Sequence, residues 1–134
     1  MSLPDERPFA VVAIDGPAAS GKSSTAEWVA RELGFWHVDS GALYRAATAA
    51  TFRTGIPPGE WTPRLVLEAA GIVTLAAKEV SMVPQLEGSF AEEEIRSASV
   101  NANVPRVAGM AEVRRWVNEQ VRAVARDRSI VVDG

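Results

Sequence analysis

The chain has 134 residues and a formal net charge of −3, with 47% hydrophobic and 23% charged residues. Such a composition is ordinary for one globular domain, and the weak negative charge argues against nucleic acid or an anionic membrane as a partner bound through bulk charge. The lack of cysteine excludes disulfides, thiolate metal sites and a cysteine nucleophile. Because no apolar run reaches membrane-spanning length and residues 1–8 have no signal-peptide pattern, we expect a cytoplasmic protein.

The first predicted elements flank a glycine-rich segment. Residues 9–15 form an apolar stretch of strand length, and residues 24–33 have the pattern of a helix that ends before Gly34. Between them, residues 16–23 fit G-x-x-x-x-G-K-[ST], the P-loop pattern. Strand, glycine loop and helix in this order place backbone N–H groups and a helix N-terminus around phosphate oxygens. The sequence therefore predicts a nucleoside triphosphate site, with a plain glycine-rich turn as the alternative.

The roles of the P-loop side chains follow from their chemistry. Lys22 supplies a mobile positive charge for the β- and γ-phosphates, and the Ser23 hydroxyl is a candidate ligand for Mg²⁺. Lys22 is also a candidate catalytic residue, because it would neutralise charge on the phosphates. The residues predicted to bind the nucleotide are Gly16, Pro17, Ala18, Ala19, Ser20, Gly21, Lys22, Ser23 and Ser24.

The next elements complete a βαβ unit. Residues 35–38 are a short apolar segment one helix after the glycine loop, which indicates a second strand parallel to the first. An alanine-rich helix is expected over residues 42–53. Thr62 then caps a short helix that opens with Pro63 and runs to about residue 70.

The following stretch departs from simple alternation of strands and helices. Residues 72–76 and 80–86 predict two short antiparallel strands, and Pro84 favours an edge position for the second. Apolar residues recur in steps of three or four from about residue 105 to 128, which predicts one long amphipathic helix. Residues 129–133 predict another parallel strand.

These elements define an α/β fold class, a parallel sheet of the P-loop nucleoside triphosphate hydrolase type with flanking helices and a small antiparallel insert. A doubly wound sheet has about five strands. Only three of parallel type are predicted here. We therefore expect the sequence to be the N-terminal part of a larger domain, truncated on its C-terminal side.

A second group of candidate residues follows the predicted strands. Asp39 stands at a strand's carboxyl end, in the crevice where open α/β sheets bind ligands. Ser40 can cap the next helix, and Arg45, unless it is only a solvated charge, presents a planar fork suited to a second phosphate. Asp133 is a candidate for holding Mg²⁺ through water, with a strand-end cap as the alternative. His37 fits a buried, hydrogen-bonded histidine better than a catalytic one.

Several of these segments together resemble the bacterial cytidylate kinase family. The most specific pair is the P-loop in residues 14–23 and the run D-S-G-A-L-Y-R in residues 39–45. Further similarity lies in residues 86–96, 107–114 and 130–134, which match the family's insert ending in E-I-R-[ST], its V-A-x-x-x-x-V-R segment and the strand before its Arg-Asp motif. The likeness runs from about residue 9 to residue 134.

This resemblance implies that the enzyme transfers the γ-phosphoryl group of ATP, with Mg²⁺, to CMP or dCMP. Ser40, Arg45 and Arg114 would hold the acceptor nucleotide. Asp39 would be a second catalytic residue, placed near the acceptor phosphate or its Mg²⁺ waters. The complete protein would be a monomer.

The resemblance also implies a division of the chain. A P-loop kinase core would comprise residues 1–61 and 104–134, and an insert that binds the nucleoside monophosphate would comprise residues 62–103. The sequence departs from the family at Pro105, where many relatives carry a hydroxyl, and it lacks the family's Arg-Asp pair and arginine-bearing lid. Two alternatives stay open, another small-molecule P-loop kinase and a non-catalytic nucleotide-binding fragment.

Overall fold

A computed structural model describes residues 9–15 and 21–134. Its elements in chain order are β1 (Val11–Ile14), α1 (Lys22–Leu33), β2 (Trp36–Asp39), α2 (Ser40–Phe52), the 3-10 helix η1 (Pro58–Glu60), α3 (Pro63–Ala69), the 3-10 helix η2 (Ala70–Ile72), β3 (Val73–Lys78), β4 (Ser81–Leu86), α4 (Glu92–Ile95), α5 (Ala98–Ala108), α6 (Ala111–Ala125) and β5 (Ile130–Asp133). No helix in these described ranges is both long and apolar enough to cross a membrane.

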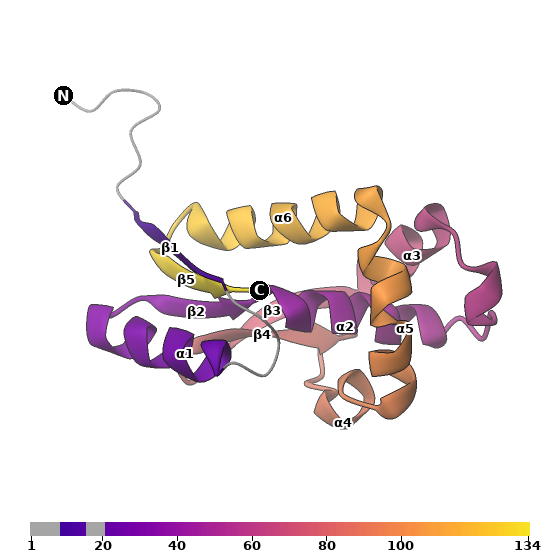
Figure 1. The fold of residues 1–134 in the computed structure, drawn as a ribbon, viewed down its shortest axis with the longest axis horizontal. Coiled ribbons are helices and arrows are strands. Elements are labelled where there is room, and N and C mark those ends of the chain that lie inside the picture. Colours follow the sequence, from indigo (N-terminus) through magenta and orange to yellow (C-terminus); the bar gives the residue numbers. More distant parts are fainter. Residues whose placement is uncertain (1–8, 16–20) are drawn as a thin grey trace.

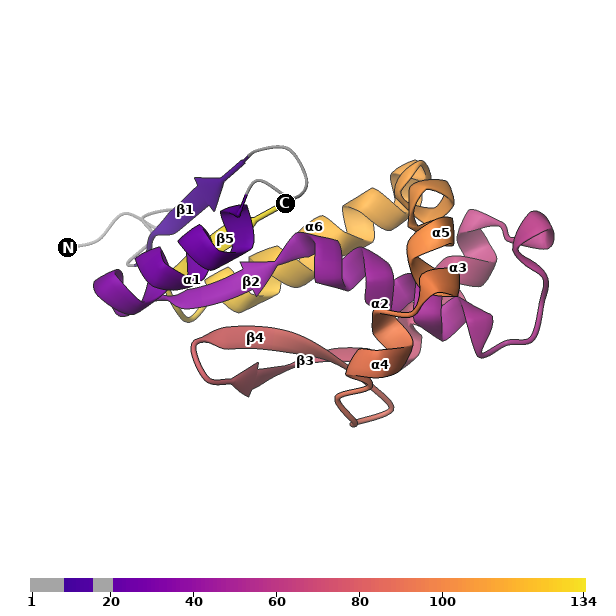
Figure 2. The same ribbon diagram turned by 60° about the horizontal axis from the view of Figure 1, so that its bottom comes forward.

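One five-stranded sheet, in the order β1-β5-β2-β4-β3, organises the chain. β5 pairs in parallel with β1 and β2, β4 pairs in parallel with β2, and only β3 runs antiparallel, against β4. The hairpin of β3 and β4 therefore continues the main sheet on the side away from β1 (Figure 2). This arrangement confirms the α/β class expected for a P-loop kinase, while the limits of the insert, residues 62–103, stay a prediction.

The expectation that Pro84 marks an edge strand is wrong. β4 lies inside the sheet, and β3 forms the edge. A proline is tolerated there because β2 pairs with β4 only at Ser81 and Met82, so Pro84 lies beyond the last residue that needs a hydrogen bond on that side.

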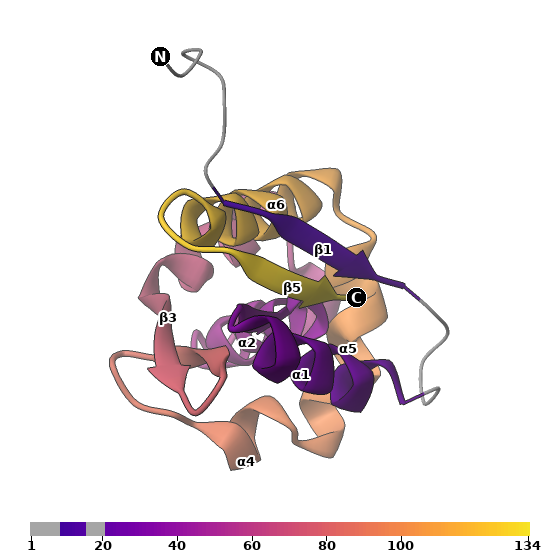
Figure 3. The ribbon, with the colours of Figure 1, turned by 90° about the vertical axis from the view of Figure 1, so that its left-hand side faces the viewer.

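Helices cover both faces of the sheet (Figures 1 and 3). Because side chains alternate along a strand, neighbouring residues of β5 serve opposite layers. Ile130 packs in a cluster with Val124 of α6, whereas Val131 packs with Ala26 and Ala30 of α1. All of these side chains are buried, so β5 is the strand shared by the two layers.

The alanine-rich helix α2 forms the centre of the larger hydrophobic core. Leu43, Ala46, Ala47 and Ala49 are fully buried along it. Small side chains let α3 and α5 approach the helix closely, which explains why alanine dominates this segment. Since α2 begins directly after β2, the same packing fixes the position of the polar residues at that junction.

The single long helix expected over residues 105–128 is in fact two helices, α5 and α6, which run in different directions (Figure 1). The break lies at Gly109 and Met110, where the backbone of Met110 is extended. Val107 and Val113 on either side are both buried in the same core, so the apolar spacing continues through the break. Periodicity alone therefore could not reveal it.

An ion-pair cluster fastens α4 to the end of α2. Nε and Nη2 of Arg53 each donate to the Glu94 carboxylate at 2.7 Å, and Nη1 donates to Glu87 at 3.4 Å. The hydrogen bond from Arg53 lowers the pKa of Glu94 below its usual value near 4.5. The side chains of Arg53 and Glu94 remain 34% and 38% exposed, which limits the strength of the pair.

We expect Glu94→Gln to lower the free energy of unfolding at pH 7 by about 0.5–1 kcal/mol. Because the folded pKa of Glu94 is lowered, its contribution is complete above the unfolded pKa and disappears as the pH falls through the folded pKa. Urea denaturation from pH 7 downward should therefore show the two proteins converging below about pH 4.5. Glu93→Gln removes the same charge from the neighbouring residue, for which the described part of the chain shows no ion pair, and serves as the control. If the free energies of unfolding of Glu94→Gln and the unmodified protein differed by the same amount at every pH, this account would be wrong.

Candidate active-site cleft

A cleft of about 520 Å³ opens at the carboxyl ends of β2 and β5, the edge at which open α/β sheets bind ligands. Side chains from α1, α2, β4 and the α4 region complete its walls. Its charged lining residues are Glu27, Asp39, Lys78, Glu79, Glu92 and Asp133 together with Arg45 and Arg96. A cleft that carries both arginines and carboxylates can take up an anionic ligand together with a cation.

Asp39 and Arg45 form a pair at the start of α2. The extended backbone of Asp39 makes it the N-cap, and its Oδ1 accepts a hydrogen bond from the N–H of Ala42 at 3.3 Å. Its Oδ2 accepts one from Nη2 of Arg45 at 3.2 Å. Gly41 leaves room for this pair, because a Cβ there would lie 3.1 Å from the Asp39 carboxylate.

The guanidinium of Arg45 retains hydrogen-bonding capacity. The side chain is 22% exposed, yet its Nε is buried and has no hydrogen-bond acceptor among the described residues. A buried donor without an acceptor is costly. An anionic ligand in the cleft would supply the missing acceptor.

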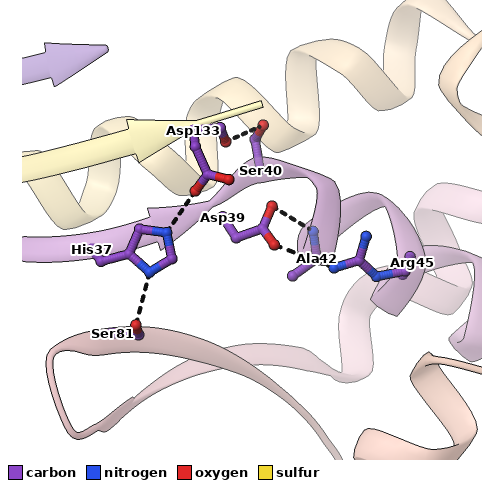
Figure 4. A network of polar contacts seen from close by, with 7 residues as sticks. All are labelled: His37, Asp39, Ser40, Ala42, Arg45, Ser81 and Asp133. Carbon is purple, nitrogen blue, oxygen red and sulfur yellow. Dashed lines mark hydrogen bonds and ion pairs between the residues drawn. The ribbon is translucent and has the colours of Figure 1, made fainter. Parts of the chain in front are cut away.

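A buried chain of hydrogen bonds crosses β5, β2 and β4 (Figure 4). Nε2 of His37 lies 2.5 Å from Oδ1 of Asp133, and its Nδ1 lies 2.8 Å from the hydroxyl of Ser81. His37 is 4% exposed and Asp133 is 0% exposed. The interpretation of His37 as a satisfied buried histidine is therefore confirmed.

Ser40 does not cap α2, contrary to expectation. The preceding Asp39 takes that role, and the Ser40 hydroxyl instead donates to the backbone carbonyl of Asp133 at 3.0 Å. This bond ties the first residue of α2 to the end of β5. Gly134 permits the close approach, since its φ is +154° and a Cβ there would lie only 1.7 Å from the Ser40 hydroxyl oxygen.

Arg114 does not line the cleft as the structure describes it. Its Nη1 donates to the carbonyl of Ala108 at 2.9 Å, at the C-terminal end of α5, where a positive charge is favoured. Burial raises the pKa of the nearby Tyr44, and the charge of Arg114 opposes that rise. The role in acceptor binding that the resemblance implies for Arg114 stays a prediction.

The structure describes the predicted phosphate-binding segment in part. Residues 16–20 lie outside the described residues, as do the side chains of Lys22 and Ser23. Gly21 caps α1 with a φ of +79°, a conformation that favours glycine, and its carbonyl accepts a hydrogen bond from the N–H of Thr25. The roles assigned to these residues stay predictions.

Five charged residues that line the cleft had no role predicted from the sequence: Glu27, Lys78, Glu79, Glu92 and Arg96. Arg96 directly follows α4 and belongs to the E-I-R segment, which was a usable signal. No such signal pointed to the other four, because a charged side chain on a helix, in a turn or at a strand end is usually solvated.

Known proteins match this chain over most of its length. The sequence profile of the cytidylate kinase family covers residues 12–134. The cytidylate kinase of Limosilactobacillus reuteri (strain DSM 20016) is 38% identical over 125 residues, which cover 92% of this chain and 54% of the relative.

Two further relatives agree with this match. The cytidylate kinase of Oceanobacillus iheyensis is 37% identical over 123 residues, covering 92% of this chain and 54% of the relative. That of Symbiobacterium thermophilum is 38% identical over 133 residues, covering 92% and 55%. The chain thus spans about half the length of the curated relatives it matches. The profile match over residues 12–134, on an α/β sheet with its cleft at the carboxyl edge, means that the chain belongs to the cytidylate kinase family.

Proposed function

We propose that the protein containing this chain transfers the γ-phosphoryl group of ATP to CMP or dCMP and forms ADP and CDP or dCDP. Family membership supports the reaction class, and the relatives carry the name cytidylate kinase. The observation that carries the proposal is the Asp39–Arg45 pair. It supplies an oriented guanidinium with a buried donor in a cleft at the carboxyl edge of the sheet.

Phosphoryl transfer needs two nucleotides held in line and neutralisation of the charge on the moving group. In this proposal the segment from Gly16 to Ser24 holds ATP, with Lys22 at the β- and γ-phosphates. Arg45 binds the acceptor phosphate, and Asp39 orients the guanidinium through their hydrogen bond. Binding both phosphates at one edge would shorten the path between donor and acceptor.

The residues of the cleft fit Mg²⁺. The described parts of the chain contain no group of three or more side chains arranged to hold a metal by themselves. Mg²⁺ does not need such a group, because it usually keeps water and binds one or two carboxylates together with substrate phosphates. Asp133, with Ser23, would hold it here. When bound, the ion neutralises charge on the β- and γ-phosphates.

The proposed contact of Arg114 with the acceptor requires a rearrangement of its side chain. Its guanidinium donates to the carbonyl of Ala108, so it must leave or share that bond to reach the cleft. Arg96 already lines the cleft and is a second candidate for acceptor binding. Ser40, which is bonded to the end of β5, stays a candidate at the first turn of α2.

The direct test is a coupled assay of the complete protein with ATP, Mg²⁺ and a panel of acceptors. We expect turnover with CMP or dCMP and far less with AMP or shikimate. Preference for AMP or shikimate would replace the proposal with another small-molecule kinase. ATP binding without transfer to any acceptor would favour a nucleotide-binding role.

Arg45→Ala should raise the KM for CMP by about 10- to 100-fold, because a charged hydrogen bond contributes roughly 1.5–3 kcal/mol. The KM for ATP should change little, since the guanidinium faces the acceptor. Steady-state kinetics with each substrate varied in turn makes the measurement. Arg64→Ala, which removes a highly exposed arginine paired with Glu68, is the control. If the KM for ATP rose and the KM for CMP did not, the acceptor role of Arg45 would be wrong.

Lys22→Ala should lower kcat of the complete protein by at least ~10³-fold, because it removes a positive charge that stabilises the negative charge of the transferring phosphoryl group. Single-turnover measurements with CMP would separate this loss from slow product release. Lys78→Ala removes a lysine from the β3 end of the cleft and should have a much smaller effect on kcat. Activity of Lys22→Ala within tenfold of the unmodified protein would refute phosphoryl transfer through this loop.

A further inference from the structure

The side chain of His37 joins the three inner strands β5, β2 and β4 at the cleft. It lies between the carboxylate of Asp133 and the hydroxyl of Ser81, with contacts of 2.5 Å and 2.8 Å (Figure 4). All three residues line the cleft, and neither His37 nor Asp133 is more than 4% exposed. Burying a polar cluster of this kind is costly unless its hydrogen bonds are made, so its geometry is strictly constrained.

The strand register explains why these residues meet. His37 is opposite Ser81 across the β2–β4 pairing, and Asp39 is opposite Asp133 across the β2–β5 pairing. His37 and Asp39 are two residues apart on β2 and so share a face of the sheet. Two carboxylates therefore sit side by side at one edge, where they repel each other.

Each of the two carboxylates has its own hydrogen-bond donor. Arg45 donates to Asp39, and His37 contacts Asp133. An ionised carboxylate only accepts hydrogen bonds, so Nε2 of His37 must carry the proton in this contact. In the neutral ring Nδ1 then accepts from the Ser81 hydroxyl. The chain Ser81–His37–Asp133 thus has one direction, and it fixes both the tautomer of the ring and the orientation of the carboxylate.

We propose that His37 is a positioning residue for Asp133, which it holds at the cleft edge in the orientation needed for Mg²⁺ and its waters. The proposal rests on the proposed kinase function and deepens it, because it assigns a role to a buried residue to which that function gave none. A histidine hydrogen-bonded to a carboxylate ligand acts on the metal through that ligand. Loss of such a contact typically costs about 10- to 100-fold in metal affinity or activity.

Two amide substitutions separate this role from simple packing. His37→Gln places its amide nitrogen near the position of Nε2 and keeps a donor for Asp133. His37→Asn is shorter, reaches only the position of Nδ1 and loses the contact with Asp133. Both variants put a neutral amide in the same buried place, so a purely structural role predicts similar effects.

The primary measurement is Mn²⁺ binding to the complete protein with ADP, followed by electron paramagnetic resonance. We expect His37→Asn to weaken Mn²⁺ binding by about tenfold or more and His37→Gln to stay within about threefold of the unmodified protein. In kinetic assays, the Mg²⁺ concentration for half-maximal rate should shift in the same order, while the KM for CMP stays unchanged. Equal Mn²⁺ affinity in the two variants would overturn the proposal.

A second measurement is made on the unmodified protein and needs a variant only to assign the resonance. Nitrogen-15 NMR of the imidazole ring reports which ring nitrogen carries the proton, and the signal lost in His37→Gln assigns the resonance. A ring that carries a proton on Nε2 supports the proposal, whereas a ring protonated only at Nδ1 overturns it. Mn²⁺ binding and the tautomer do not depend on the acceptor. A protein that fails to phosphorylate CMP would therefore refute the proposed function without deciding this inference.

Discussion

The parallel pairing of β5 between β1 and β2 is the constraint on which the rest of the structure depends. Alternation along this one strand gives Ile130 to the layer under α6 and Val131 to the layer under α1, so both hydrophobic layers share it. The same alternation brings Asp133 to the cleft edge on the α1 side. A shift of one residue in this pairing would exchange the two faces and bury the acid in the wrong layer. Core packing and site geometry therefore cannot be varied independently.

The cleft depends on how charge is distributed along that edge. Asp39 and Asp133 are neighbours in the register, and each is held by a separate donor from within the fold. Because His37 contacts Asp133, Arg45 is left to bind Asp39, and its guanidinium lies on the α2 side of the cleft. Asp133, by contrast, is fully buried at the end of β5. The two sides thus differ in kind, one suited to an anion at a helix start and the other to a cation beside a carboxylate.

Much of the fold could be predicted because its signals are local. Strand lengths, the helix stop at Gly34 and the Thr62 cap appear in short stretches of sequence and agree with the structure to within a few residues. The break at Gly109 was missed because both flanking helices bury their apolar side chains in one core and so keep the same spacing. The edge-strand prediction from Pro84 was wrong because β2 pairs with β4 only at Ser81 and Met82, a limit that the sequence does not show.

The site could be predicted only as far as its residues lie at strand ends. Asp39, Arg45 and Asp133 were found because the carboxyl edge of a parallel sheet gathers ligands. The partners of His37 could not be predicted, because they come from two other strands whose register no local pattern gives. The position of Arg114 depends on the turn between α5 and α6, which the apolar spacing does not reveal. The prediction fails wherever a contact depends on register or on the direction of a helix.

The two walls of the cleft also differ in how firmly they are held. On the side of β2 and β5, the contacts are buried hydrogen bonds whose loss would leave polar groups without partners in the interior. On the side of α4, Arg96 follows a short helix that is held by one buried side chain, Ile95, and by the partly exposed Arg53–Glu94 pair. The ion pair contributes about 1 kcal/mol or less and burial of the Ile95 side chain about 1.5–3 kcal/mol, whereas the strand edge is held by several buried hydrogen bonds and by the packing of both layers. Adjustment of the cleft to a ligand should therefore fall on α4 and Arg96, while Asp39 and Asp133 keep their places.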